Sequence, residues 1–260
     1  MNQKANQIKL TQADVILALW RHHQNTPEKL ATWHLQVVLE RVAESMAFEN
    51  QPVDLDRLRR LINEKESINT HAELGRIENC SSAPELSERL AVPLVAIYDE
   101  ILQSRPDQII VTSEWLCLWH KRLAGHLFPD WAGRFRDVNV QVGSHTPPPY
   151  YEVPIHMRQF CDDLSARLLH LNQESVANCA ELLAWADWRF QWIHPFKDFN
   201  GRIGRVLLAA LLYKLALPHI QTAPTDPAVR RKYLDALQSA DQSEMGQLTE
   251  MWIRRVEEAL

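Results

Sequence analysis

The sequence predicts an all-α domain with one short flap, and three observations support this. Apolar residues recur three and four positions apart along most of the 260 residues, which is the period of amphipathic helices. Only seven residues are glycine, so few positions supply the positive φ that tight turns need. Residues 133–149 depart from the helical pattern: valines alternate with polar residues before a proline run, which predicts a short β-hairpin or extended flap.

In each expected helix, apolar residues at helical spacing form one face, and polar or charged residues occupy the positions between them. In chain order the segments are 11–23, 30–46, 53–68, 86–102, 112–124, 154–171, 179–193, 201–217, 226–240 and 248–260. Trp185, Trp188 and Trp192 recur at helical spacing, and we expect them to fill the core. No repeat or linker interrupts the chain, so we expect one compact unit, made of an N-terminal helical extension (1–82) and a main domain (83–260).

Composition limits the classes of function. A net charge of −5 argues against a broad surface for nucleic acid. The first ten residues lack the apolar core of a signal peptide, and no apolar run is long enough to span a bilayer. The cysteines, Cys80, Cys117, Cys161 and Cys179, show no Cys-x-x-Cys spacing, which predicts free thiols. We expect a cytoplasmic protein without membrane or nucleic-acid partners; self-association stays open.

The segment 193–205, IHPFKDFNGRIGR, concentrates groups that bind phosphate. A loop ending in Asn200 and Gly201 runs into a helix, whose first backbone N–H groups are free and carry positive partial charge. Such a helix start suits an anion. Arg202 and Arg205 are three residues apart, so both lie on one side of the first turn, and guanidinium groups match phosphate oxygens. The segment predicts a phosphate site.

The same segment contains groups for chemistry on that phosphate. His194 titrates near neutral pH as a free side chain and could take a proton from an incoming hydroxyl. Asp198 could hold Mg²⁺, which needs few protein carboxylates when it rides on a nucleotide. Each residue alone is common in ordinary surfaces and cores. Their joint spacing, His-Pro-Phe-x-Asp-x-Asn-Gly-Arg-x-x-Arg, is far more specific.

At these residues the sequence resembles the Fic family. The family motif reads His, Pro, Phe, any residue, Asp or Glu, Gly or Ala, Asn, Gly or Lys, Arg, two of any, Arg. The matching positions are His194, Pro195, Phe196, Asp198, Asn200, Gly201, Arg202 and Arg205. The stretch AGRFRDVNVQVGSHTPPP, residues 132–149, is similar to the family segment that leads into a β-hairpin over the active site. The resemblance covers about residues 70–255 and implies a Fic-type helical domain.

The resemblance implies a protein adenylyltransferase, which moves AMP from ATP to a hydroxyl side chain of a target protein. His194 would be the general base and Asp198 would hold Mg²⁺. Asn200 and Gly201 would line an anion hole with Arg202, and Arg205 would contact the γ-phosphate. Tyr233 resembles a position near the adenine or ribose. The target would pair with the flap by strand addition, along Val138, Asn139, Val140, Gln141 and Val142.

Phe199 departs from the motif, where the family residue is small. A bulky residue is penalised if φ is positive there, and its ring either packs away from the phosphates or crowds them. If it crowds them, replacement by glycine should raise ATP affinity or the transfer rate. The alternatives to the enzyme are therefore a weakly catalytic or non-catalytic Fic-fold protein that binds a nucleotide or partner, or an enzyme that removes AMP from a modified protein.

A second element, residues 74–79, resembles the end of a Fic inhibitory helix. The family pattern is Ser or Thr, three of any, Glu, then Gly or Asn. Glu78 and Asn79 match it, whereas Leu74 stands in place of Ser or Thr. The resemblance implies that Glu78 pairs with Arg205 and withdraws it from the γ-phosphate. The alternative is an ordinary helix end with Asn79 as its cap.

Overall fold

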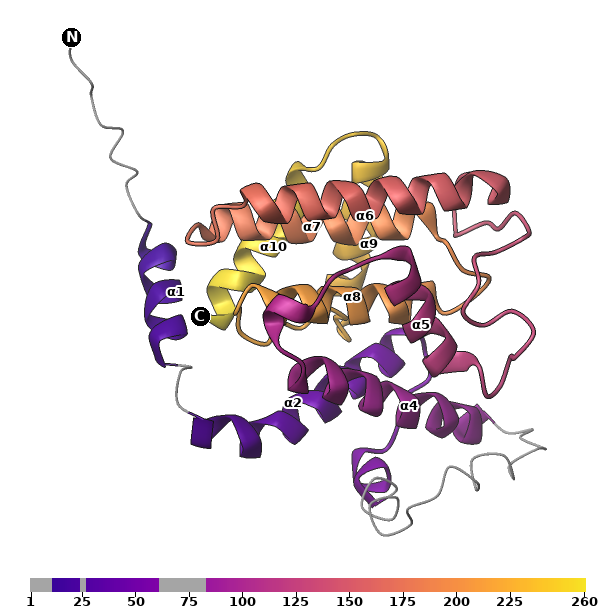
Figure 1. The fold of residues 1–260 in the computed structure, drawn as a ribbon, viewed down its shortest axis with the longest axis horizontal. Helices are drawn as coiled ribbons and strands as arrows, with labels where there is room; N and C mark the ends of the chain where they lie inside the picture. The colour runs from indigo at the N-terminus through magenta and orange to yellow at the C-terminus, as the bar shows by residue number, and fades with distance from the viewer. Residues whose placement is uncertain (1–10, 24–26, 61–82) are drawn as a thin grey trace.

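The computed structural model describes residues 11–23, 27–60 and 83–260, and its architecture is helical (Figure 1). The helices, in chain order, are α1 (Gln12–His23), α2 (Pro27–Phe48), α4 (Ala83–Gln103), α5 (Ser113–Ala124), α6 (Val153–His170), α7 (Val176–Ile193), α8 (Asn200–Lys214), α9 (Pro227–Asp241) and α10 (Gly246–Ala259). Single 3-10 turns, η2 (Pro106–Gln108) and η3 (Tyr150–Glu152), precede α5 and α6. Residues 55–60 are helical as well.

Helix α8 is the centre of the molecule. Nearly every residue from Asn200 to Leu212 is buried, as expected of a helix that is apolar on all sides. Figure 1 shows α7 and α6 above α8, with α2 and α4 below it. Side chains of α7 lie directly against Gly204 of α8, where a Cβ would stand 2.4 Å from Nε2 of Gln191 and 3.2 Å from Cδ1 of Phe190. This contact joins the two helices that flank the motif.

The N-terminal helices share the same core. Leu17 of α1, with Val38 and Val42 of α2, belongs to one apolar cluster with Leu90 and Leu94 of α4. The boundary that we placed between residues 82 and 83 stays a prediction. The described residues before it pack on the rest of the chain and contribute directly to the cavity described below.

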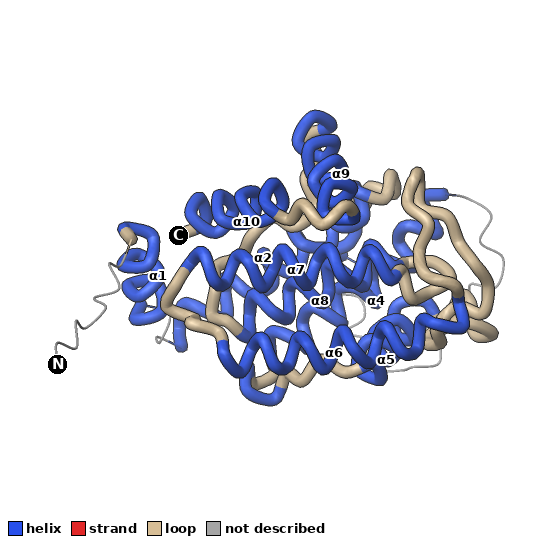
Figure 2. The backbone as a smooth tube through the Cα atoms, turned by 90° about the horizontal axis from the view of Figure 1, so that it is seen from above, coloured by secondary structure: helices blue, strands red, loops and turns tan. Residues whose placement is uncertain are grey.

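The predicted hairpin does not form a sheet. Figure 2 shows loop throughout this stretch, and the described residues contain no strand. A single antiparallel bridge joins Val142 to His145, with N···O distances of 3.0 and 2.9 Å. The physical reason lies in the return segment: Pro147, Pro148 and Pro149 have no backbone N–H to donate to a ladder. The flap, residues 134–149, is therefore a loop with a short, turned tip.

Two other predictions concern the chain as a whole. Cys117, Cys161 and Cys179 are free thiols, as expected, and Cys80 lies outside the described residues. Among the helices that the structure describes, none is both long enough and apolar enough to cross a membrane.

Candidate active site

A cavity of about 630 Å³ lies where α7 ends and α8 begins. The end of α7, the loop to α8, α9, the turn after α2 and the flap tip (residues 141–146) all contribute to its lining. Of the residues predicted for the site, those in the lining are Gln141, Val142, His194, Asp198, Asn200, Gly201, Arg205 and Tyr233. Its volume falls in the range of small-molecule sites. The structure thus gathers most of the predicted site around one cavity.

His194 is the residue that ends α7. Its backbone is left-handed, with φ 49° and ψ 62°, and its N–H donates to the carbonyl of Phe190 at 3.1 Å. Burial, together with the nearby charges of Arg136 and His145, lowers the pKa of His194 to about 4, and the backbone of Gln191 and the Asp198 carboxylate only partly oppose this. The ring is therefore neutral at physiological pH and able to accept a proton.

The loop after His194 is closed by the side chain of Asn200. Its Oδ1 accepts from the N–H of Phe196, and its Nδ2 donates to the carbonyl of Phe196, both at 2.8 Å. Asn200 lies in the cavity lining, and its side-chain amide is committed to closing the loop; its place in an anion hole stays a prediction. The open donors are those of the backbone: Thr112, Ser175 and Asp226 cap the starts of α5, α7 and α9, but no side chain caps α8.

Phe199 has the positive φ that makes a bulky residue unfavourable, at 60°. Its ring stacks on Trp131, with centroids 5.8 Å apart, and lies 5.7 Å from the ring of Phe128. The side chain is 7% exposed. The ring therefore packs into an aromatic cluster beside the loop, and this packing holds the loop in its left-handed turn.

Asp198 is the residue available for a divalent cation. Its side chain is exposed, and Oδ1 accepts from the N–H of Phe199 at 2.6 Å. The described residues contain no cluster of three His, Cys, Asp or Glu side chains that could hold a metal ion by itself. One fixed carboxylate fits Mg²⁺ that is carried mainly by nucleotide phosphates and water.

Arg205 is held by the end of α2 and the turn that follows. Its Nε donates to Oγ of Ser45 at 2.9 Å, and its Nη2 donates to Oε1 of Glu49 at 2.6 Å. Burial raises the pKa of Glu49, but the charges of Arg205, Arg202 and Arg230 outweigh it and leave that pKa below its usual value. Glu49 is therefore an ionised carboxylate inside a cluster of arginines.

Sequence reasoning missed Glu49. The residue that we assigned to Arg205, Glu78, lies outside the described residues. The signal was present, because Ser45-Met-Ala-Phe-Glu49-Asn50 fits the pattern of Ser or Thr, three of any, Glu, then Gly or Asn at every position. The stretch 74–79 fits it only in part.

Gly201 and Arg202 surround the same carboxylate. A Cβ on Gly201 would stand 2.4 Å from Oε1 of Glu49, so only glycine lets the carboxylate lie against the start of α8. Arg202 is 4% exposed, donates to Oε1 of Gln51, and places its guanidinium 5.2 Å from the centre of the Phe199 ring. Both predicted residues thus lie at the helix start, although Arg202 is not in the cavity lining.

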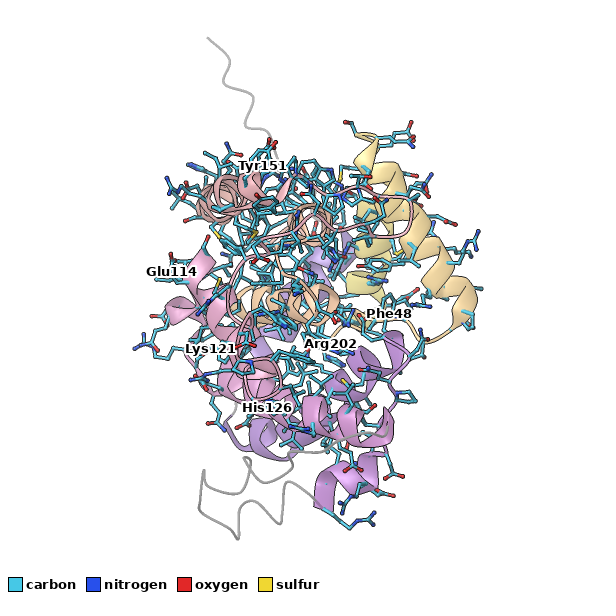
Figure 3. The ribbon with its side chains drawn as sticks, turned by 90° about the vertical axis from the view of Figure 1, so that its right-hand side faces the viewer. Phe48, Glu114, Lys121, His126, Tyr151 and Arg202 are labelled. Atoms are coloured by element: carbon cyan, nitrogen blue, oxygen red, sulfur yellow. The ribbon has the colours of Figure 1, made fainter. Side chains whose placement is uncertain are left out.

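Phe48 and Tyr233 form the side of the cavity nearest α9. Their rings meet edge to face, with centroids 6.0 Å apart, and Figure 3 shows Phe48 between the violet N-terminal helices and the yellow C-terminal helices. The hydroxyl of Tyr233 donates to Oδ1 of Asp187 at 2.9 Å. Burial raises the pKa of Asp187 to about 6. The charge of Arg255 and the hydrogen bonds that Tyr233 and Trp252 donate to Asp187 oppose this rise. Tyr233 therefore presents its ring to the cavity.

Arg136 joins the flap to the loop and was also missed. The side chain is 3% exposed, and Nε donates to the carbonyl of His194 at 2.9 Å. Nη1 donates to the carbonyl of Val138 at 3.0 Å and Nη2 to that of Pro148 at 2.5 Å. Both stems of the flap are thus tied to the residue that ends α7. Val138, Asn139 and Val140 lie outside the cavity lining, on the flap beside it.

A family model described as Fic/DOC family matches residues 110–212. A curated protein named protein adenylyltransferase Fic, from Culex quinquefasciatus, is 26% identical over 210 residues, which is 81% of this chain and 38% of that protein. Its namesake from Aedes aegypti is 32% identical over 126 residues, or 48% of this chain and 24% of that protein. The chain therefore spans well under half the length of these relatives.

Solved structures share the fold. A Fic domain-containing signalling protein from Bacteroides thetaiotaomicron has a TM-score of 0.73 at 18% identity, covering 95% of this chain and 93% of that one. The Fic-1 protein of C. elegans has a TM-score of 0.70 at 18% identity, covering 95% of this chain and 69% of that one. The likeness extends to the N-terminal helices, since both comparisons cover nearly the whole chain.

Proposed function

The chain carries a Fic/DOC family domain over residues 110–212, and on that premise we propose that it transfers AMP from ATP to a hydroxyl group of a target protein and is held inactive by Glu49. The supporting observation is the cavity itself. It is lined by a neutral histidine, an exposed carboxylate and the uncapped start of a helix, together with Arg205 and the glutamate that pairs with it.

In the proposed reaction the target's hydroxyl oxygen attacks the α-phosphorus of ATP. His194 takes the hydroxyl proton, the bond from the α-phosphorus to its β-bridging oxygen breaks, and pyrophosphate leaves. The low pKa of His194 keeps the ring free to accept that proton. Asp198 would hold Mg²⁺, which neutralises phosphate charge when it is bound.

The triphosphate would bind at the start of α8. Backbone N–H groups of the first turn are free to donate, because no side chain caps the helix. Gly201 allows an oxygen to approach the backbone closely. Arg205 would bind the γ-phosphate and Arg202 would contribute positive charge beside it.

Glu49 would compete with the γ-phosphate for Arg205. A carboxylate oxygen 2.6 Å from Nη2, with both side chains mostly buried, takes the donor that a phosphate oxygen needs. This assigns to Glu49 the role that the sequence led us to give Glu78. Removing the Glu49 carboxylate should therefore free Arg205 without changing the base.

The test is incubation with ATP labelled on the α-phosphate and Mg²⁺, scored by label on the chain itself and on proteins of a cell extract. Glu49→Gly should raise labelling at least tenfold, because it frees a charged hydrogen-bond donor. Glu49→Gly with His194→Ala should label nothing yet bind ATP in calorimetry. Glu174→Gly, on an exposed turn, is the matched control and should behave as the wild type.

Two outcomes would replace the proposal. A Glu49→Gly protein that binds ATP but labels nothing would favour a nucleotide-binding or partner-binding role without catalysis. Removal of AMP from a modified protein is favoured by one observation, namely that Glu49 shares the cavity with His194 and could orient a water there. In that case a pre-labelled protein would lose its label with the wild type and keep it with Glu49→Gly.

A further inference from the structure

His145 fastens the flap tip to two helices. Its Nδ1 lies 3.2 Å from Oδ2 of Asp241 on α9. Its Nε2 lies 2.9 Å from the carbonyl oxygen of Trp192, in the last turn of α7. Nε2 of Gln238, also on α9, donates to Oγ of Ser144 at 3.2 Å. One imidazole thus joins the flap, the helix that carries His194 and the helix across the cavity.

The two partners of the ring fix its protonation. A backbone carbonyl can only accept hydrogen bonds, and so can an ionised carboxylate. Asp241 already accepts at Oδ1 from Nε1 of Trp188, at 2.9 Å. A neutral ring has one N–H, so one of its nitrogens would direct a lone pair at an oxygen. Only the imidazolium satisfies both, and the carbonyl end of a helix favours such a cation.

Hydrogen bonds within the flap tip link its other residues to His145. Nε2 of Gln141 donates to the carbonyls of Gly143 and His145, at 3.1 and 2.8 Å. Oγ1 of Thr146 donates to Oε1 of Gln141 at 3.0 Å. With the bridge from Val142 to His145, these contacts make residues 141–146 one unit, and most of this unit lines the cavity.

We propose that doubly protonated His145 is a positioning residue that holds the flap tip against α7 and α9 as a wall of the nucleotide cavity, so that ATP binds more tightly while this histidine carries both protons. The inference rests on the proposed function for its ligand. It assigns a role to two side chains, His145 and Asp241, that the Fic motif does not contain.

The groups around His145 come from four elements, α9, α7, α6 and η3. Asp241 faces it from α9. Arg189 of α7 places its guanidinium 4.4 Å from the ring centre of Trp192, the residue that His145 also contacts. His156 of α6 meets the same ring and lies 3.6 Å from Glu152 of η3. His194 lies close enough for His145 to lower its pKa.

The effect of His145 can be separated from that of His194. Burial first, then the neighbouring charges, keep the pKa of His194 at about 4. His194 is therefore neutral throughout the range of about pH 5 to 8 in which histidines commonly lose their second proton. A change in ATP binding over that range should come from elsewhere, and the proposed role of His145 predicts that ATP affinity falls as pH rises.

The first experiment measures the dissociation constant of Mg·ATP by calorimetry between about pH 5.5 and 8, in the Glu49→Gly background. We expect it to rise about tenfold with pH. In Asp241→Asn the new amide can donate to Nδ1 of a neutral ring and still accept from Trp188, so binding should be tight and independent of pH. His145→Ala should bind weakly at every pH. His170→Ala and Asp162→Asn, both exposed on α6, are the matched controls.

The second experiment needs no ATP. Nitrogen-15 spectra of the His145 ring at pH 6 should show two protonated nitrogens in the wild type and one in Asp241→Asn. Amide exchange of residues 141–146 should quicken in His145→Ala. A neutral His145 in the wild type at pH 6, or ATP binding with the same pH dependence in Asp241→Asn, would overturn the proposal. Absence of ATP binding in every variant would count against the proposed function. The spectra would still show whether both nitrogens of the His145 ring are protonated.

Discussion

The loop 194–199 and the flap 134–149 both line the cavity, yet different contacts hold them. The loop is fixed by buried groups close by: Asn200 pairs with the backbone of Phe196, and the ring of Phe199 stacks on Trp131. The flap is mostly exposed and hangs on a few side chains, chiefly Arg136 at its stems and His145 at its tip. The loop, which carries His194 and Asp198, is therefore the more firmly held side of the cavity, called the rigid side below. The flap is the side that depends on a few long side chains.

The strongest test of the rigid side is Phe199→Gly. Losing a buried phenylalanine ring costs about 3–5 kcal/mol, and relief of the positive φ returns about 1 kcal/mol. We therefore expect a net loss of about 2–4 kcal/mol in unfolding free energy, measured by urea titration, with ATP affinity no better than before.

The sequence left two outcomes open, and the gain in ATP binding was expected only if the ring crowds the phosphates; its packing on Trp131 favours the other outcome. Phe128→Ala is the companion variant, because it removes a neighbour of the ring but leaves the φ of Phe199 unchanged. If Phe199→Gly is as stable as the wild type and binds ATP more tightly, the ring crowds the phosphates and the loop is not held by it.

His120 ties the loop to the rest of the fold and makes its stability depend on pH. Nε2 faces the carbonyl of Asp198 at 3.2 Å, and Nδ1 accepts from the N–H of Gly133 at 2.7 Å. Burial lowers the pKa of His120 to about 4, although Asp198 opposes this. Since the unfolded chain binds the proton first, this stability is present above about pH 6.5 and is lost as pH falls towards 4.

The expected contribution of His120 is up to about 3 kcal/mol. Urea titrations at pH 7 and pH 4.5 should show a smaller loss of stability in His120→Gln than in the wild type, by roughly that amount. His170→Gln, with an exposed side chain, should lose as much as the wild type. An unchanged pH dependence in His120→Gln would mean that this histidine is charged in the folded protein.

The difference between local contacts in the loop and long-range contacts in the flap also explains how much of the site the sequence predicts. The roles of His194 and Gly201 depend on local backbone, so a motif of a dozen residues was enough to place them together. Asn200 lies in the cavity lining as expected, but the motif does not signal that its amide bonds the backbone of Phe196, because that pairing depends on how the loop closes. Glu49, Arg136 and His145 contact partners far along the chain, and helical or strand periodicity does not signal such contacts. For Glu49 a local pattern was present, in residues 45–50, but it was overlooked.

The flap shows the limit of alternation as a signal. Val138, Val140 and Val142 alternate with polar residues as strand residues do, but a strand also needs a partner with free N–H groups. The prolines of the return segment remove those donors. We propose that a target protein supplies the missing strand partner along this edge of the flap.

Ser45→Ala tests the segment that lies between the two sides, where α2 meets Arg205. Ser45 is 1% exposed, and its Oγ accepts from Nε of Arg205. Leaving that donor unpaired costs about 1–2 kcal/mol, so the pairing of Arg205 with Glu49 should weaken and AMP transfer should rise several-fold, less than in Glu49→Gly. Ser165→Ala, on the exposed face of α6, should change nothing. Transfer equal to the wild type would show that Glu49 alone restrains Arg205.

Val140→Pro should have the smallest effect on the folded chain and the most selective effect on function. Among the described residues, the backbone N–H of Val140 donates no hydrogen bond, so proline removes no contact of the fold and should change the unfolding free energy by less than about 0.5 kcal/mol. If targets pair with this edge, losing one donor and gaining a ring should lower labelling of a target protein at least threefold, with ATP binding unchanged. Val140→Ala keeps the N–H and should label the target nearly as well as the parent, all three measured in the Glu49→Gly background. Equal labelling by the proline and alanine variants would mean that the target is not held by strand addition, and the flap would then be a wall of the nucleotide cavity alone.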